Sequence, residues 1–430
     1  MGKAVVITGD VEDDHERQGT VDGTAHVLAA VIGSGVLALA WSVAQLGWLL
    51  GPAVLLGFAM VTVYTSTLLA DCYRFPSRLR SQKPHLHGRR PREVFLCGVA
   101  QYANLWGTMV GYTITATASM MAVKRANCFH REGHSAGCRV SGNTFMLSLG
   151  LENITWVSVV AAAMSFAYSL IGLCLCAARW VSHGETWNAF QALGNIAFAY
   201  TFAEVLIEIQ DTLKSPPPEK QDDEEGEHVR DRADRRVLPL GGLHGLRRLR
   251  DSAPGNILTG FGFYEPYWLV DIANLCIVLH LAGAYQVFAQ PIFAAVEKSV
   301  AARWPEAKFV STVYKVRLPF STGGRTLSFA APKVALRTAM VVLTTVVAAL
   351  VPFFNSVLGL LGASSFWPLS VYFPVTMHIV QAKVRPWTVK WVLLQGLSLV
   401  CLLVSLFASV GSVADIVGSL KQSAPFKVQY

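Results

Sequence analysis

Apolar blocks of about 20 residues recur along almost the whole chain, and this feature limits the possible folds more than any other. A helix of roughly 20 residues is about 30 Å long, which matches the hydrocarbon core of a bilayer. Hydrophobic residues make up 53% of the 430 residues and charged residues only 15%, which is more apolar surface than one soluble core can bury. The sequence therefore predicts an all-α polytopic membrane protein. Nine spans are expected, at residues 24–45, 47–73, 94–123, 154–178, 188–212, 267–292, 334–353, 356–381 and 391–413.

Basic residues between these blocks predict the orientation of the chain. Residues 74–92 are rich in Arg and Lys, and the positive-inside rule places such a short loop in the cytoplasm. Two spans precede it, so the acidic N-terminal tail, residues 1–22, is expected to be cytoplasmic too. The basic stretches 297–333 and 383–385 fit the same orientation. The net charge of +8 is therefore interpreted as a signal of membrane topology, and no nucleic acid is expected as a partner. The expected partner of residues 23–426 is the lipid bilayer.

Two of the eight cysteines differ from the rest. Cys128 and Cys138 share a polar loop after the third span, which the predicted orientation places outside. In an oxidising compartment they could form a disulfide, and the sequence leaves paired and free thiols open. The other six lie in or beside apolar blocks, where a small polarisable side chain packs well.

Signatures of enzymatic chemistry are missing from the sequence. We find no Gly-rich phosphate loop, no nucleophile elbow and no paired catalytic carboxylates. His85 and His87 lie in a basic loop and are interpreted as solvated residues rather than metal ligands. The sequence thus indicates a protein that is not an enzyme, with no metal and no cofactor.

The first span carries two glycines around a serine near its middle. Glycine is costly inside a helix, so its use there calls for a reason. One reason is a close helix crossing, since small residues let backbones approach in lipid. The other is a broken helix whose freed N–H groups and dipole bind a carboxylate. The candidate ligand-binding residues are Ile32, Gly33, Ser34 and Gly35.

A second interrupted apolar segment starts the second half of the spans, at residues 195–204. Paired interrupted helices in corresponding halves of a membrane protein indicate a substrate site. Ala199, Tyr200 and Phe202 are the candidates here. The two aromatic rings would wall the apolar part of a ligand, although an ordinary core position fits them equally well.

Several strings along the chain resemble those of a known family, the plant amino acid permeases of the amino acid and auxin permease family, within the amino acid–polyamine–organocation superfamily. The resemblance runs in order from about Arg17 to Phe426. The strings are Ala30–Leu37, Ala44–Trp48, Tyr64–Arg74, Gly111–Ala116, Leu206–Leu213, Gly260–Pro266 and Ala363–Pro374.

This resemblance implies a proton-coupled symporter that imports amino acids across the plasma membrane. It implies about 11 spans in two inverted repeats of five helices, with the first and sixth spans broken. In this chain those breaks correspond to Ile32–Gly35 and Ala199–Phe202. Protons would be the coupling ion, and amino acids the substrates.

Four ionisable residues in or near the spans are candidates for proton coupling: His26, Glu204, Asp271 and His280. A charged side chain costs about 2.5–3.5 kcal/mol at mid-bilayer, so such residues usually have a function. His26 could equally be an interfacial histidine, and Glu204 stands where the family pattern has an uncharged residue. Asp271 and His280 lie nine positions apart and do not form one helical pair.

Residues 213–256 depart from the family pattern. They begin with three prolines, continue through an acidic run and then become Arg-rich, where the family has a span. A hydrophilic loop is one interpretation. The other is that residues 237–250 are a span translated in the wrong reading frame, since Leu246–Arg250 can be written in codons that yield Tyr-Ala-Ala-Phe-Gly from the second base. A second family span is largely missing near residues 143–150.

These departures leave two alternatives to a transporter. A chain without the missing spans could be a defective or non-transporting relative. It could also be a receptor that senses amino acids without carrying them.

Overall fold

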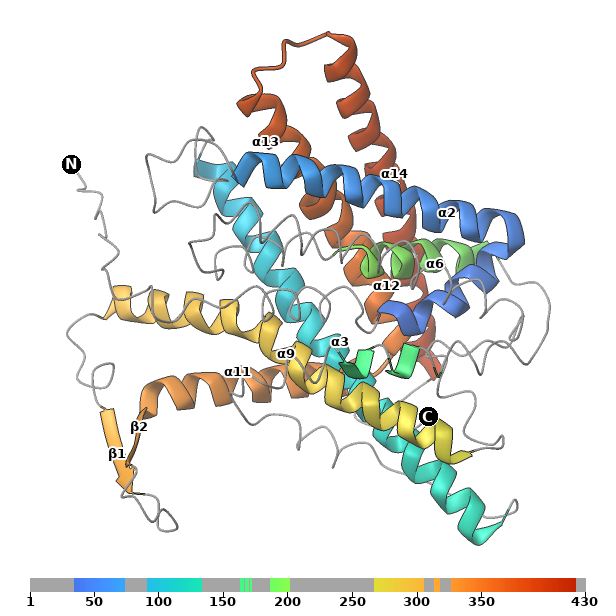
Figure 1. The fold of residues 1–430 in the computed structure, drawn as a ribbon, viewed down its shortest axis with the longest axis vertical. Helices are drawn as coiled ribbons and strands as arrows, with labels where there is room; N and C mark the ends of the chain where they lie inside the picture. The colour runs from blue at the N-terminus through green and yellow to red at the C-terminus, as the bar shows by residue number, and fades with distance from the viewer. Residues whose placement is uncertain are drawn as a thin grey trace.

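A computed structural model describes residues 35–73, 91–133, 163–165, 167–169, 171, 186–201, 267–304, 313–317 and 326–422. Helices dominate these regions, and only one small sheet accompanies them (Figure 1). The helices are α2 (Gly35–Tyr73), α3 (Pro91–Glu132), α6 (Thr186–Ala199), α9 (Tyr267–Arg303), α11 (Ala331–Leu350), α12 (Phe354–Ser365), the π-helix η4 (Phe366–Tyr372), α13 (Phe373–Gln381) and α14 (Val389–Gln422). The strands are β1 (Val313–Arg317) and β2 (Thr326–Ala330).

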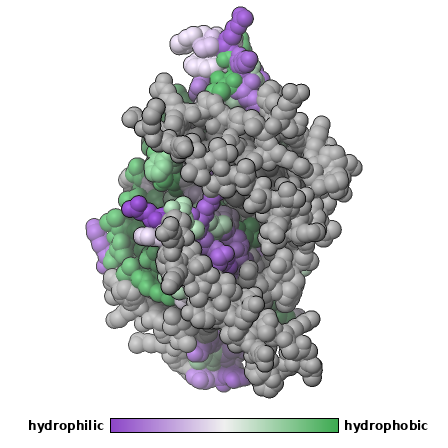
Figure 2. All heavy atoms as spheres, turned by 90° about the vertical axis from the view of Figure 1, so that its left-hand side faces the viewer, coloured by the Kyte–Doolittle hydropathy of each residue, from purple (hydrophilic) through white to green (hydrophobic). Residues whose placement is uncertain are grey.

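Five segments of the described chain are long and apolar enough to cross a membrane. They are Leu49–Ala70, Tyr267–Arg303, Lys333–Leu350, Phe354–Gln381 and Val389–Lys421. Each coincides with a predicted span, although several helices run further than the sequence suggested. Most of the predicted span 154–178 lies outside the described residues, as does 202–212 of the span 188–212. Figure 2 shows a patch of hydrophobic side chains at mid-height of one face, with hydrophilic ones beside it as well as at the upper and lower ends.

Helix α14 shows how these helices are arranged relative to lipid. Large apolar residues seven positions apart are exposed on one side: Leu393, Val400 and Phe407. The residue that directly follows each of these in the sequence is buried: Leu394, Cys401 and Ala408. Because seven residues are close to two helical turns, the helix presents one apolar face outwards and another, smaller one to its neighbours. This is the pattern expected where lipid, rather than water, surrounds the bundle.

Two local irregularities fall where the sequence has helix breakers. Gly47 has φ 80° inside α2, in the left-handed region that glycine adopts without strain. It is the first residue of the predicted span 47–73, so the kink falls at the predicted boundary between the first two spans. The predicted span 356–381 is continuous but widens into η4, where Pro368 has no N–H to give to a regular helical ladder.

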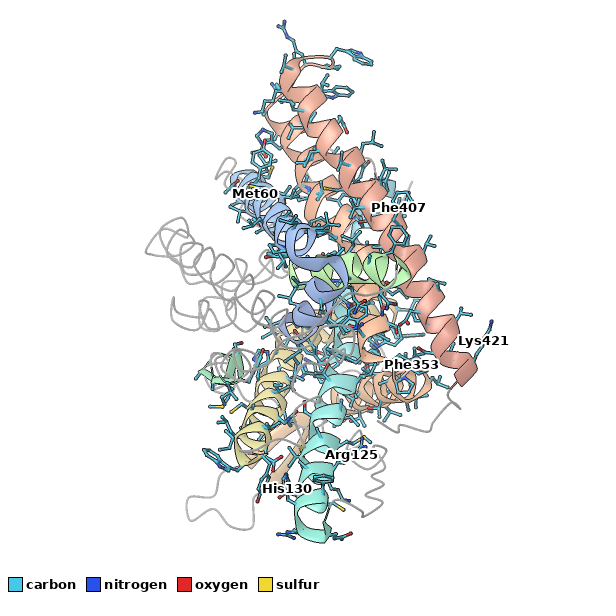
Figure 3. The ribbon with its side chains drawn as sticks, turned by 90° about the vertical axis from the view of Figure 1, so that its right-hand side faces the viewer. Met60, Arg125, His130, Phe353, Phe407 and Lys421 are labelled. Carbon is cyan, nitrogen blue, oxygen red and sulfur yellow. The ribbon has the colours of Figure 1, made fainter. Side chains whose placement is uncertain are left out.

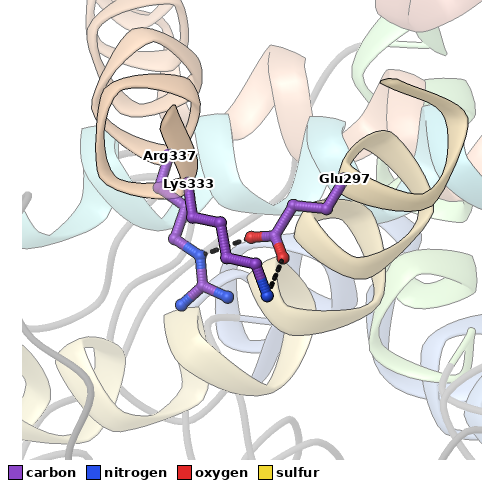
Figure 4. A network of polar contacts seen from close by, with 3 residues as sticks. All are labelled: Glu297, Lys333 and Arg337. Carbon is purple, nitrogen blue, oxygen red and sulfur yellow. Dashed lines mark hydrogen bonds and ion pairs between the residues drawn. The ribbon is translucent and has the colours of Figure 1, made fainter. Parts of the chain in front are cut away.

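The predicted basic loop 297–333 is more ordered than the sequence suggested. Helix α9 continues into it as far as Arg303, and β1 and β2 pair as an antiparallel hairpin with Val313 opposite Ala330. At the boundary, Glu297 of α9 joins α11: its carboxylate lies 2.8 Å from Arg337 Nε and 3.4 Å from Lys333 Nζ (Figure 4). This ion-pair network ties the end of α9 to the start of α11.

Helix α6 is packed closely between several elements of the described bundle. It contacts α2, α12 and α14 extensively. Glycines on both sides make this approach possible, because a Cβ at Gly362 would collide with Gly194 O and the backbone of Phe198. On the α14 side, a Cβ at Gly411 would lie 2.6 Å from Phe190 Cβ. The backbone of α6 therefore lies directly against its neighbours.

We predict that Gly359→Ala destabilises the bundle. The added methyl would lie 2.7 Å from Ser412 Oγ and 3.1 Å from Asn195 Oδ1, so these side chains of α14 and α6 would have to shift. Overpacking of this kind costs about 1–3 kcal/mol. Thermal unfolding of the purified protein in detergent should show a lower Tm. Gly396→Ala on α14 is the matched control, since nothing lies within 4 Å of its added methyl. Equal Tm values for the two variants would contradict the packing argument.

Candidate functional site

The two predicted helix breaks meet in the structure. A Cβ built on Gly35, at the start of α2, would lie 2.8 Å from Ala199 Cα and 2.9 Å from Ala199 Cβ, at the end of α6. Only a glycine permits this approach of the two backbones. Of the remaining candidates, Ile32, Gly33, Ser34 and Phe202 lie outside the described residues. The junction of Gly35 with Ala199 is therefore the part of the candidate site that the structure describes.

Helix α6 ends at the position where the sequence placed its interruption. After Ala199 the chain tightens into a turn, in which Tyr200 N donates to Ala197 O and Thr201 N donates to Phe198 O, each at 3.1 Å. The Thr201 hydroxyl also donates to Ala197 O, at 2.6 Å. These bonds to the third and fourth preceding carbonyls satisfy part of the helix end.

Tyr200 is enclosed by aromatic side chains that the sequence reasoning missed. It is fully buried, and its ring stacks on Phe58 of α2 with the centroids 6.4 Å apart. Phe58 in turn packs on Phe366, the first residue of η4, at 4.7 Å. Thr62 Oγ1 donates to Tyr200 O at 3.5 Å. The break thus borders an aromatic cluster from three elements. The sequence could have indicated Phe366, because Pro368 interrupts the regular pattern of its helix. No sequence feature indicated Phe58.

His280 and Asp271 occupy different surroundings, as their spacing predicted. His280 is fully buried in α9, with Nδ1 2.7 Å from Ser165 Oγ and its ring 5.5 Å from that of Tyr168. Asp271 lies in the second turn of α9, where Oδ2 accepts a 2.6 Å hydrogen bond from Asn127 Nδ2 of α3. The other two coupling candidates, His26 and Glu204, lie outside the described residues.

Near Asp271, the outer part of α3 is fastened to α9. The ring of His130 stacks on Tyr267 with the centroids 3.9 Å apart; Figure 3 labels His130 close to the end of α3.

Cys128 is disulfide-bonded. Its predicted partner Cys138 lies outside the described residues, so the pairing of these two stays a prediction. Within the described ranges, no group of three or more His, Cys, Asp or Glu side chains could hold a metal ion.

We predict that Gly35→Val abolishes amino acid binding while leaving insertion into the membrane intact. The new side chain would collide with Ala199, so the two segments would have to separate, and this would disrupt a ligand site built between them. Binding of radiolabelled amino acid to the purified protein measures the effect. Gly57→Val, in the same helix, is the control because nothing lies within 4 Å of its Cβ. Binding by Gly35→Val at wild-type affinity would refute the role of the junction.

Comparison with known proteins places the chain in a family. The family described as transmembrane amino acid transporter protein matches residues 16–223 and 245–417. The unmatched residues, 224–244, lie inside the hydrophilic segment 213–256. A solved structure of a Na+-coupled sialic acid symporter covers 95% of this chain and 91% of its own, with a TM-score of 0.47 and 10% identity.

Relatives of known name agree with the family match. Amino acid permease 2 of Arabidopsis thaliana is 46% identical over 452 residues, covering 96% of this chain and 91% of the relative. Amino acid permease 4 of the same plant is 47% identical over 452 residues, covering 96% of each. The chain is therefore a helical, multi-pass membrane transporter rather than an enzyme, and it belongs to the transmembrane amino acid transporter family, among the plant amino acid permeases.

Proposed function

We propose that this chain is a proton-coupled symporter that imports amino acids across the plasma membrane and binds them where α2 meets α6. The observation that carries the proposal is the contact of Gly35 with Ala199, two residues that the sequence independently marked as part of helix breaks. Helix ends expose backbone N–H and C=O groups that have no partner within the helix. A zwitterionic amino acid offers a carboxylate and an ammonium group to complement them.

In this proposal the N–H groups near the start of α2 bind the substrate carboxylate. The helix dipole is positive at that end, which adds to the attraction. The aromatic cluster of Tyr200, Phe58 and Phe366 borders the junction and would contact the apolar part of the substrate. Rocking of the two repeats would then expose the site alternately to each side of the membrane.

For proton coupling, His280 is the described candidate with the most suitable surroundings. It is fully buried within a membrane helix, and a hydroxyl lies 2.7 Å from its Nδ1. An imidazole titrates near neutral pH, so it can exchange a proton during the transport cycle. His26, Glu204 and Asp271 remain the other proposed coupling residues, with protons as the coupling ion and no further cofactor.

One observation favours a second candidate function. The family match omits residues 224–244, within the segment where the family has a span. Without that span, neighbouring helices would expose backbone and polar groups to lipid, which the bilayer cannot satisfy. The chain as written would then be a non-transporting relative, or a receptor that binds amino acids without flux.

We predict that a proton gradient drives uptake only by a frame-corrected protein. Two purified proteins are reconstituted in liposomes: the chain as written, and a version in which residues 237–250 are replaced by their apolar alternative-frame translation. We expect the corrected version to take up amino acids faster when the outside is acidic, and the chain as written to transport poorly or not at all. Uptake by the corrected version that ignores the gradient would reject coupling. Equal transport by both proteins would reject the frame-shift hypothesis.

We further predict that His26→Ala, made in the frame-corrected protein, flattens the pH dependence of uptake more than it reduces maximal substrate binding. An imidazole that carries the coupled proton gives uptake its pH dependence, and alanine cannot titrate. Initial uptake rates between pH 5 and 8 measure this effect, with equilibrium binding as the control. A pH profile identical to that of the parent protein would identify His26 as an interfacial histidine.

A further inference from the structure

A carboxylate outside the helix breaks joins three helices of the bundle. Asp415 lies on α14, between Phe407 and Lys421, which Figure 3 labels. Its Oδ2 accepts a 2.8 Å hydrogen bond from Gln191 Nε2 of α6. The same oxygen accepts a second hydrogen bond, from Ser356 Oγ of α12. Both donors are 2% exposed, while Asp415 itself is half-buried.

Among the described residues, the partners of the Asp415 carboxylate are neutral. The ion pairs that join two described residues are those of Glu297, far along the sequence from Asp415. Helices α6 and α12 contain no ionisable side chain at all. Lys421, on α14 itself, lies six positions further along the helix and is exposed. Hydrogen bonding to donors on α6 and α12, rather than charge pairing, is therefore what Asp415 does in this structure.

The face of α6 that Asp415 contacts leads to the helix break. Gln191, Asn195 and Ala199 are four residues apart, so they lie on one side of the helix. In the middle of this series, Asn195 Nδ2 donates to Asn355 Oδ1 of α12 at 2.7 Å. At its end, Ala199 contacts Gly35. A short helix of 14 residues moves as one body, so its anchoring at Gln191 and Asn195 decides where Ala199 lies.

We propose that Asp415 is a positioning residue for the substrate site. As a hydrogen-bond acceptor it fixes α6 against α12 and α14, and thereby holds Ala199 against Gly35. The inference rests on the proposed function insofar as that junction binds the amino acid. It assigns the role to the acceptor oxygen and not to the charge, because both hydrogen bonds end on the same Oδ2 and the amide oxygen of an asparagine could accept them as well.

The test compares Asp415→Leu, which removes the acceptor, with Asp415→Asn, which keeps an acceptor but removes the charge. Ser409→Ala is the control on the same helix, since the Ser409 hydroxyl bonds only within α14, to Ser405 O. Hydrogen exchange of residues 186–199 is measured by mass spectrometry on the purified full chain in lipid nanodiscs. We expect exchange about tenfold faster in Asp415→Leu, because both hydrogen bonds are lost and their buried donors are left without an acceptor, and unchanged exchange in the other two.

Two results would overturn the positioning role. Exchange in Asp415→Leu equal to that in Ser409→Ala would show that the acceptor does not hold α6. An Asp415→Asn variant as fast as Asp415→Leu would show that the charge acts, and not the acceptor. If Asp415→Leu does not fold, Gln191→Leu removes one of the two bonds at nearly the same side-chain size and is expected to speed exchange of α6 about threefold. Unchanged exchange in that variant would overturn the role too.

Binding of radiolabelled alanine to the protein in the same nanodiscs tests whether the position of α6 affects substrate binding. We expect the Kd to rise about tenfold in Asp415→Leu and to stay within about twofold of wild type in Asp415→Asn. A change in Asp415→Leu exchange with unchanged alanine affinity would reject the link to the substrate site. Failure of the wild-type chain to bind alanine or any other amino acid would reject the proposed function instead, and exchange alone would still decide whether Asp415 holds α6.

Discussion

Contact between helix backbones without intervening side chains is the constraint on which the described bundle depends. Between α6 and α12 it rests on Gly194, Gly359 and Gly362, and between α6 and α14 on Gly411. In lipid, apolar helices gain little by leaving their surroundings, so association depends on close van der Waals packing and on hydrogen bonds between helices. Glycine provides the first by removing the side chain. It also shortens the distance across which Gln191 and Asn195 reach their partners.

Many of the buried hydroxyl groups in this bundle have an acceptor within their own helix. In α3, Thr108, Thr113, Thr115 and Thr117 each donate to the carbonyl four residues earlier, at 2.7–3.0 Å. Such bonds satisfy the hydroxyl without a second helix and leave its methyl group free to pack. Polar side chains that instead reach another helix are fewer, and each of them specifies which helices are neighbours. Trp106 Nε1, for example, donates to Thr344 Oγ1 of α11 at 3.0 Å.

The candidate site combines close packing of helix backbones with buried polar groups. A substrate cavity in a membrane needs unpaired backbone groups, yet irregular backbone is tolerated only where protein encloses it. The end of α6 meets this condition: its turn at Tyr200 is fully buried, bounded by Phe58 and Phe366 and braced by Thr62. The long contacts of α6 with α12 and α14 keep that irregular end in place. Under the proposed function, transport would depend on this rigid enclosure of the interrupted helix.

Much of the fold could be predicted from the sequence. The apolar blocks predicted the positions of the spans, because the bilayer imposes its thickness on each helix separately. Gly47 and Pro368 marked local irregularities through their own backbone preferences. The extent of α9 beyond residue 292 and the β1–β2 hairpin were not predicted, since contacts with α11 stabilise the first and strand pairing the second.

The sequence by itself determined that the chain is a helical membrane transporter of the amino acid permease type, and it marked the segments where helices are predicted to be interrupted. Hydrophobicity, glycine and motif strings are properties of single segments, so no fold is needed to recognise them. Only the tertiary structure decided which segments meet. Gly35 touches Ala199, and Gln191 bonds to Asp415 across 224 positions, because packing in three dimensions selects such partners and the local sequence around each of them carries no record of the other.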